Sequence, residues 1–385
     1  MLSTLLSTAA TLLLIRYLSP ADWGSSAAIL GLGQLIGALV SYGSQIERVR
    51  RYSGLDGDER SAEAALDARA RWTLSFSLLT VGLVTLLFSI PAGATVICAA
   101  GVYSSLGATN YFVAARRFWL AGSIVLLEKT FLFGTVAASV LFQFASVTTL
   151  PIVQGLVGLL AGLISLLSIQ TTPPAMSLRD HARRVVRQYG SARYVGIASL
   201  APSLLLLDVS LVHVFSTPEN AAQFSLASKL VAPLSLATTS IVTVLLPFMV
   251  GEHSERVLLK RGVAVFFVGG FLLVLAVLLA SANWWVPTFF GKDYSGAVFP
   301  VRLYLVNTFL AFFTRILVTR GQARNDDRVT SLMIACQVLL ALVGIAIGAQ
   351  LGGASGAAVS VVSTNLVLAL ALSVRGRSIS GRRGR

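Results

Sequence analysis

The sequence predicts an all-α integral membrane protein with about twelve transmembrane helices, and three observations support this fold class. First, 55% of the 385 residues are hydrophobic, only 12% are charged, and the mean hydropathy is +0.80. Soluble domains carry about 25% charged residues. Second, apolar runs near the roughly 20 residues that cross about 30 Å of hydrocarbon recur along the whole chain. Third, the basic residues between these runs alternate in number from loop to loop.

The apolar runs give the expected membrane spans in chain order. They cover residues 2–18, 24–46, 72–90, 93–115, 120–145, 149–169, 192–214, 220–249, 261–282, 296–318, 329–349 and 354–374. Six spans form an expected N-terminal lobe and six a C-terminal lobe, as in transporters built by duplication. The expected parts are the lobes at 1–169 and 192–374, a basic cytoplasmic linker at 170–191 and a basic cytoplasmic tail at 375–385.

The Lys and Arg residues orient the chain, because cytoplasmic loops of membrane proteins are enriched in them. With the N-terminus inside, the inner loops and tail hold 24 basic residues, whereas the outer loops hold only Arg16 and Lys292. Both termini are therefore expected in the cytoplasm. The net charge of +14 then reflects this bias and an attraction to anionic lipid, and no nucleic-acid partner is expected.

The two longest inner segments differ in character. Residues 47–71 nearly balance their charges, which predicts a solvated helix. Residues 170–193 hold a double proline followed by arginines at helical spacing, which predicts a basic amphipathic linker at the membrane surface.

Two outer turns, "RYLSPADWG" and "HVFSTPENAAQ", look alike and occupy equivalent places in the two halves. In the first, Ser19 is expected to cap a helix, Pro20 to take its first position and Asp22 to complete a capping box. The second turn offers Thr217, Pro218 and Glu219 for the same roles. An internal repeat explains the likeness, although any short outer hairpin would share it.

Small residues inside the spans predict packing rather than chemistry. The glycines of "GLGQLIGALVSYG" and "GLLAG" lack the spacing and the preceding strand of a dinucleotide site, and close helix contact explains them better. Cys98 and Cys336 lie in apolar runs and are expected to be buried inert thiols. No nucleotide loop, nucleophile elbow or histidine cluster is present, so the sequence predicts no enzyme, no cofactor and no metal site.

Charged residues inside spans are costly and therefore functional by default. They are Glu128, Lys129, Asp208, Lys229, Arg302 and Arg315, with Arg16 near the outer end of the first span. Asp208 and Lys229 lie on consecutive antiparallel spans, where they would form either a structural ion pair or a switch in which the substrate competes for the lysine. Glu128 and Lys129 are sequence neighbours and are expected on different helix faces. Arg315 is best explained by snorkelling.

Several motifs, taken in order, resemble one family. "IRYLSPADWG" is similar to the amino-terminal signature of the polysaccharide-biosynthesis flippases, the oligosaccharide branch of the multidrug/oligosaccharidyl-lipid/polysaccharide exporter superfamily. The segment from Asp208 to Pro247, "FFGKDYSGAVFPVRLYL" and "GGASGAAVS" resemble later parts of that family in the expected order. Trp23 and Phe224 stand where the family usually has tyrosine.

The resemblance implies a flippase of the bacterial plasma membrane, in which two six-helix lobes enclose a central cavity and move an undecaprenyl-pyrophosphate-linked oligosaccharide outward by alternating access. A polymerase or ligase of the same pathway would be a further partner. The pyrophosphate calls for cations in a wet cavity, for which Lys229, Lys129, Arg16 and Arg302 are the candidates. Asp208 and Glu128 are the candidates for ion coupling or switching.

Rival functions remain at this stage. A drug/cation antiporter of the same superfamily would require a more acidic cavity, and a membrane polymerase or ligase would require a large outer loop. A non-transporting assembly partner of a glycan-synthesis complex is the third alternative.

Overall fold

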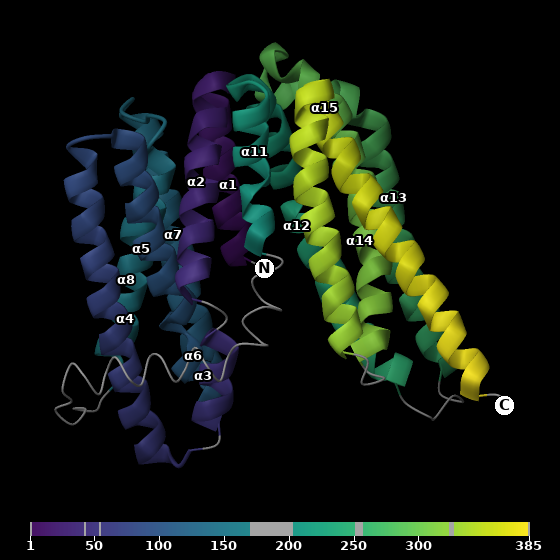
Figure 1. Cartoon of the computed structure of the whole chain (residues 1–385), viewed down its shortest axis with the longest axis horizontal. Helices are drawn as coiled ribbons and strands as arrows, with labels where there is room; N and C mark the ends of the chain where they lie inside the picture. The colour runs from purple at the N-terminus through teal and green to yellow at the C-terminus, as the bar shows by residue number, and fades with distance from the viewer. Residues whose placement is uncertain are drawn as a thin grey trace. The chain divides into compact units, whose positions relative to one another are not determined.

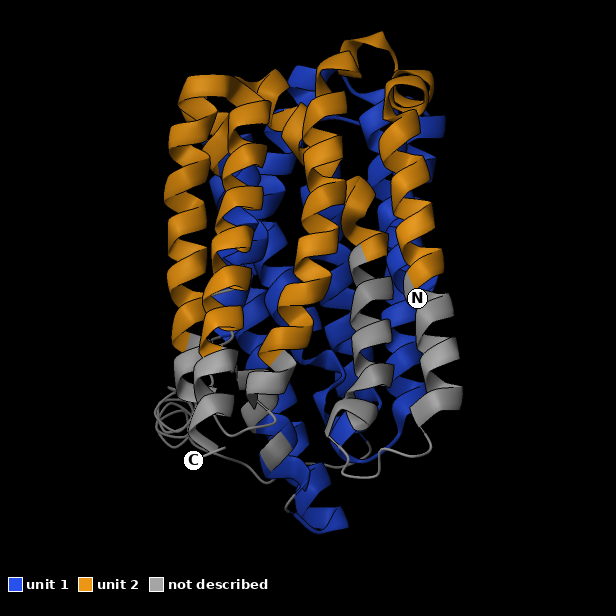
Figure 2. Ribbon diagram, turned by 90° about the vertical axis from the view of Figure 1, so that its right-hand side faces the viewer, with its two compact units in different colours: residues 1–210 blue, residues 211–385 orange. Residues whose placement is uncertain are grey.

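In the part of the chain that it describes, the computed structural model consists of helices joined by short turns, and the all-α fold class is confirmed (Figure 1). The described residues are 2–41, 44–53, 55–169, 203–250, 257–322 and 327–383. The chain divides into two compact units, residues 1–210 and 211–385 (Figure 2). The expected linker at 170–191 lies outside the described residues, so the lobe boundaries proposed from the sequence stay a prediction.

Unit 1 contains eight described α-helices before the undescribed segment. They are α1 (Leu2–Tyr17), α2 (Pro20–Ser41), α3 (Ser44–Ser53), α4 (Gly57–Leu86), α5 (Ile90–Ala108), α6 (Asn110–Ala114), α7 (Phe118–Leu141) and α8 (Thr149–Leu167). A short 3-10 turn, η1 (Leu205–Leu207), follows and leads into α11 (Asp208–Phe215), which begins in unit 1 and ends in unit 2.

Unit 2 contains the remaining helices. They are α12 (Pro218–Val250), α13 (Val257–Phe290), the 3-10 segment η2 (Lys292–Ala297), α14 (Val298–Gln322) and α15 (Asp327–Arg383). The long α15 is two helices joined at Gly352 and Gly353, whose backbone angles are not helical. The expected break between spans 329–349 and 354–374 is therefore confirmed, and α15 has a first limb before this break and a second limb after it.

Seven helical segments of the described chain are long and apolar enough to span a membrane. They are Pro20–Ser41, Ile90–Ala114, Phe118–Leu141, Thr149–Leu167, Gly269–Phe290, Lys292–Val318 and Leu332–Arg375, of which the last contains both limbs of α15. The helix α4 is not among them; in it, the charged segment 57–71 and the apolar span that follows form one continuous helix.

Glycines let helix α5 of unit 1 approach α2 and α8 closely. A Cβ atom on Gly158 of α8 would lie 2.4 Å from the carbonyl oxygen of Gly101 on α5. A Cβ atom on Gly33 of α2 would likewise lie 2.6 Å from that of Cys98. Close helix packing therefore explains these glycines, as the sequence predicted. Cys98 is buried, but Cys336 is exposed on α15, so the expectation of a buried thiol was wrong there.

The predicted Ser19 cap and the start of α2 at Pro20 are confirmed, and the helix-start prediction is corrected in unit 2. The Asp22 backbone N–H donates to Ser19 Oγ at 3.2 Å, and Ser19 Oγ donates to the Asp22 carboxylate at 2.7 Å. At the start of α12 the equivalent N–H belongs to Asn220, which donates to Thr217 Oγ1 at 3.3 Å. The third helical position makes this contact, so Asn220, and not Glu219, corresponds to Asp22.

Candidate functional site

Two of the predicted span charges neutralise each other. Lys129 Nζ and Glu128 Oε1 form an ion pair on α7, with 21% of the lysine side chain exposed and 7% of the glutamate. The prediction that these neighbours point to different faces was wrong: both side chains are flexible enough to meet beside the helix. Lys129 therefore neutralises Glu128, and it is less available to an anionic ligand than the sequence suggested.

The other predicted cations differ in their surroundings. Arg16 is exposed in the last turn of α1. Lys229 is half-buried on α12 and has no carboxylate partner within the described residues. Arg302 of α14 donates through Nε to the Leu279 carbonyl oxygen of α13 at 3.3 Å, which fixes the guanidinium without neutralising it.

The predicted Asp208–Lys229 pair stays a prediction. Asp208 is the first residue of α11 in unit 1, and its Oδ1 accepts from the Val209 backbone N–H at 2.6 Å. Lys229 belongs to unit 2. The carboxylate thus occupies a helix start, where it interacts favourably with the helix dipole.

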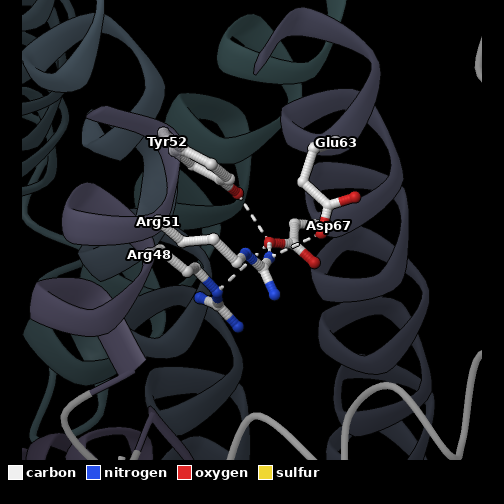
Figure 3. A network of polar contacts seen from close by, with 5 residues as sticks. All are labelled: Arg48, Arg51, Tyr52, Glu63 and Asp67. Carbon is white, nitrogen blue, oxygen red and sulfur yellow. Dashed lines mark hydrogen bonds and ion pairs between the residues drawn. The ribbon is translucent and has the colours of Figure 1, made fainter. Parts of the chain in front are cut away.

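A buried polar network in unit 1 was missed at the sequence level (Figure 3). Tyr52 of α3 donates its hydroxyl to Asp67 Oδ2 of α4 at 2.6 Å. Arg51 donates to the same oxygen and lies 3.1 Å from Glu63 Oε1, while Arg48 Nε lies 3.8 Å from Asp67. Figure 3 shows the side chains of α3 and α4 converging on the Asp67 carboxylate.

Apolar packing explains why these charges are buried. Tyr52 is 1% exposed and packs with Ala64, Ala65 and Ala68 of α4 in one hydrophobic cluster. Arg60 closes the turn by donating to the Tyr52 and Leu55 carbonyl oxygens. The expected solvated helix over 47–71 is therefore wrong: it is a helical hairpin with a packed, charged interior. Small alanines beside Glu63 and Asp67, spaced four apart, are the sequence feature that indicates it.

Arg71 extends the network one turn along α4. Its guanidinium lies directly against Gly107 of α5, where any Cβ would collide with it, and its Nε has no hydrogen-bond partner in the described chain. Burial, followed by repulsion from Arg48, lowers the pKa of Arg71 to about 10. Burial lowers the pKa of Arg48 as well, but Asp67, Tyr103 and Tyr52 together outweigh burial, so the net shift is upward.

The network holds three arginines against two carboxylates and therefore keeps a positive charge in a buried place. Within the described residues, no group of three or more His, Cys, Asp or Glu side chains could hold a metal ion.

Comparison with known proteins rests on structure. No protein-family model matches the sequence, and no curated protein matches it. A lipid II flippase, MurJ, in an inward closed conformation has a TM-score of 0.72 at 14% identity, with 97% of this chain and 86% of that chain covered. The chain has the fold of the MOP superfamily transporters.

Two further structures support this fold assignment. An inward-facing multidrug resistance transporter of the MATE family has a TM-score of 0.67 at 15% identity, covering 98% of this chain and 94% of its own. A MOP superfamily transporter from Pyrococcus furiosus, described as having a binding pocket of reverse polarity, has a TM-score of 0.58 at 14% identity, with 100% and 93% covered. These likenesses establish the fold, and substrate chemistry has to be argued from the residues.

Proposed function

We propose that this chain is a flippase that moves a polyprenyl-pyrophosphate-linked oligosaccharide from the inner to the outer leaflet of a bacterial plasma membrane by alternating access. One observation supports this most strongly. Of the charged residues that the sequence places inside spans, Lys229 and Arg302 have no carboxylate partner in the described chain, whereas the carboxylate of Glu128 is already paired. Among the described residues, the span charges that lack an oppositely charged partner therefore include two cations, Lys229 and Arg302.

A positive interior suits an anionic head group. A pyrophosphate cannot cross hydrocarbon unaided, and cations in a hydrated pathway would replace its lost hydration. Lys229 and Arg302 are the primary contacts in this proposal, and Arg16 receives the phosphate at the outer end. Lys129 serves only if the substrate displaces Glu128 from it. Asp208 is assigned to switching, and the same carboxylates remain the candidates for ion coupling.

The same observation disfavours a drug/cation antiporter. Such a transporter needs an acidic cavity for a cationic drug, but most of the charged residues expected in the spans are basic, and Glu128 is held by Lys129. Likewise, a non-transporting assembly partner has no need for unpaired cations in its spans, since each of them costs stability.

Leaflet transfer in liposomes tests the proposal. The purified chain is reconstituted, undecaprenyl pyrophosphate bearing a neutral tetrasaccharide is supplied in one leaflet, and its appearance in the other is followed. We expect transfer by the wild-type chain, and a loss of at least about tenfold in Lys229→Ala, as for one charged hydrogen bond. The matched control is Lys292→Ala, because Lys292 is exposed on η2 and should be dispensable. Absence of wild-type transfer, or equal loss in both variants, would contradict the proposal.

A further inference from the structure

Unit 2 contains a chain of three amide side chains that neither the packing nor the cationic residues explain. Gln337 Nε2, on the first limb of α15, donates to Asn365 Oδ1 on the second limb at 3.0 Å. Asn365 Nδ2 donates in turn to Asn307 Oδ1 on α14 at 2.6 Å. This amide chain thus links three helical segments that lie far apart in the sequence.

The three amides share one depth in the membrane. Each lies roughly 17 Å from the outer end of its predicted span, at about 1.5 Å per residue, close to the middle of about 30 Å of hydrocarbon. All three are half-buried within their unit. Half-exposed amides at this depth would be costly against lipid, which places them beside a hydrated pathway.

Each end of the amide chain has a polar atom without a hydrogen-bond partner in the described part of the protein. Gln337 Oε1 accepts no hydrogen bond and Asn307 Nδ2 donates none in the described part of the protein. Reversing every amide only exchanges which end donates and which accepts. Nearby hydroxyls differ, because Thr308 Oγ1 is satisfied by the Tyr304 carbonyl oxygen and Thr364 Oγ1 by that of Ser360.

This arrangement selects a ligand class. It carries no charge and therefore does not match a pyrophosphate. A cation requires several converging oxygens, but two of the three amide oxygens already accept N–H groups. Sugar hydroxyls both donate and accept, so they can satisfy the acceptor end and the donor end together.

We infer that the Gln337–Asn365–Asn307 amide chain is a glycan-binding site, at which hydroxyl groups of the oligosaccharide bond to Gln337 Oε1 and Asn307 Nδ2. This inference rests on the proposed flippase function and divides the substrate between two sets of residues. Cations bind the pyrophosphate, and the amide chain binds the neutral sugars. It also assigns a role to polar side chains that would otherwise only join helices.

The test compares two lipids in the same liposomes: undecaprenyl pyrophosphate bearing a neutral tetrasaccharide, and bare undecaprenyl pyrophosphate. We expect Asn307→Ala and Gln337→Ala each to raise the apparent KM for the glycan-bearing lipid about tenfold, as for one or two neutral hydrogen bonds. The apparent KM for the bare lipid should not change. Thr308→Val is the matched control, because this neighbouring hydroxyl bonds within its own helix.

Each other outcome overturns the inference in a distinguishable way. Equal changes for both lipids, accompanied by a lower Tm, would mean that the amide chain only holds α14 to α15. A changed sodium dependence at an unchanged ratio of the two KM values would mean a cation site. Transfer of both lipids with no effect of any variant would remove the glycan site and leave the flippase intact. Transfer of neither lipid by the wild-type chain would remove the proposed function itself.

Discussion

At the scale of single residues, Tyr52 shows how one phenol can tie two helices together. Its hydroxyl donates to the buried Asp67 carboxylate, and burial together with that carboxylate raises the pKa of Tyr52 above its ordinary value. The phenol of the unfolded chain ionises near pH 10. Because the folded-state pKa is higher, the stabilisation by Tyr52 is complete below about pH 10 and is lost as the pH rises through the folded-state pKa.

We therefore expect Tyr52→Phe to lower the free energy of unfolding by about 1.5–3 kcal/mol at pH 7, as for a hydrogen bond to a charged group. The difference in Tm between wild type and variant should narrow above pH 10. Thermal denaturation in detergent from pH 7 to 11 measures both effects. Tyr17→Phe is the control, because Tyr17 is exposed. A difference that stays constant across this range would contradict the argument.

Asp67 provides the second prediction at this scale. Removing its charge leaves the buried Arg48 and the partly exposed Arg51 with only Glu63 to oppose them. Breaking one side of a buried ion pair costs about 3–5 kcal/mol, because the remaining charge is uncompensated. We expect Asp67→Asn to lower the Tm strongly in detergent scans. Asp56→Asn should have little effect, because Asp56 is exposed and makes no side-chain cap at the start of α4. Equal melting of the two variants would show that the network contributes little.

The charges show the limit of sequence reasoning at this scale. Their depth along each span follows from counting residues, and this is how Lys229 and Arg302 were identified. Their partners do not follow, because ion pairing depends on rotamers and on neighbouring helices. Thus Glu128 and Lys129 were expected apart and are paired, and the Asp67 network was taken as solvent-exposed.

At the scale of elements, the contact between α5 and α8 depends on glycine. A Cβ at position 158 would lie 2.4 Å from the Gly101 carbonyl oxygen, so Gly158→Ala must force the two helices apart. We expect a lower Tm and a smaller fraction of monodisperse protein on size-exclusion chromatography. Gly122→Ala on α7 is the matched control, because its Cβ would meet nothing within 4 Å, and alanine favours a helix by up to about 1 kcal/mol. If Gly158→Ala were as stable as the control, α5 and α8 would have to shift relative to each other and accommodate the added Cβ without loss of stability.

The helices themselves were largely predictable. Apolar length fixed most spans, and the Ser19 cap fixed the start of α2. The hairpin of α3 and α4 was not predictable by the same rule, because its core is made of alanines and one tyrosine between charged residues. A hydropathy criterion counts such a segment as polar. The alanines and the charged side chains alternate, however, so that they pack together between α3 and α4.

At the scale of the whole molecule, the two helix starts support a duplicated chain. Ser19 and Asp22 in unit 1 correspond in position to Thr217 and Asn220 in unit 2, and both pairs share the bond from the backbone N–H to the capping hydroxyl. If the halves are parallel repeats, both turns lie on the same side of the membrane. The distribution of Lys and Arg predicts that this side is the outer one, since nearly all of them lie in the segments expected inside.

Cysteine labelling in whole cells tests this orientation. In a chain whose two native cysteines are replaced by alanine, Lys292→Cys should react with a membrane-impermeant maleimide, because η2 belongs to the expected outer loop. Ser177→Cys in the expected cytoplasmic linker should react only after the cells are permeabilised. The comparison is internally controlled, since each variant is labelled before and after permeabilisation. Labelling of Ser177→Cys in intact cells would invert the topology. Arg16 would then lie at the cytoplasmic end of its span, and the Asp67 network would lie outside. The proposed direction of pyrophosphate transfer would be reversed as well.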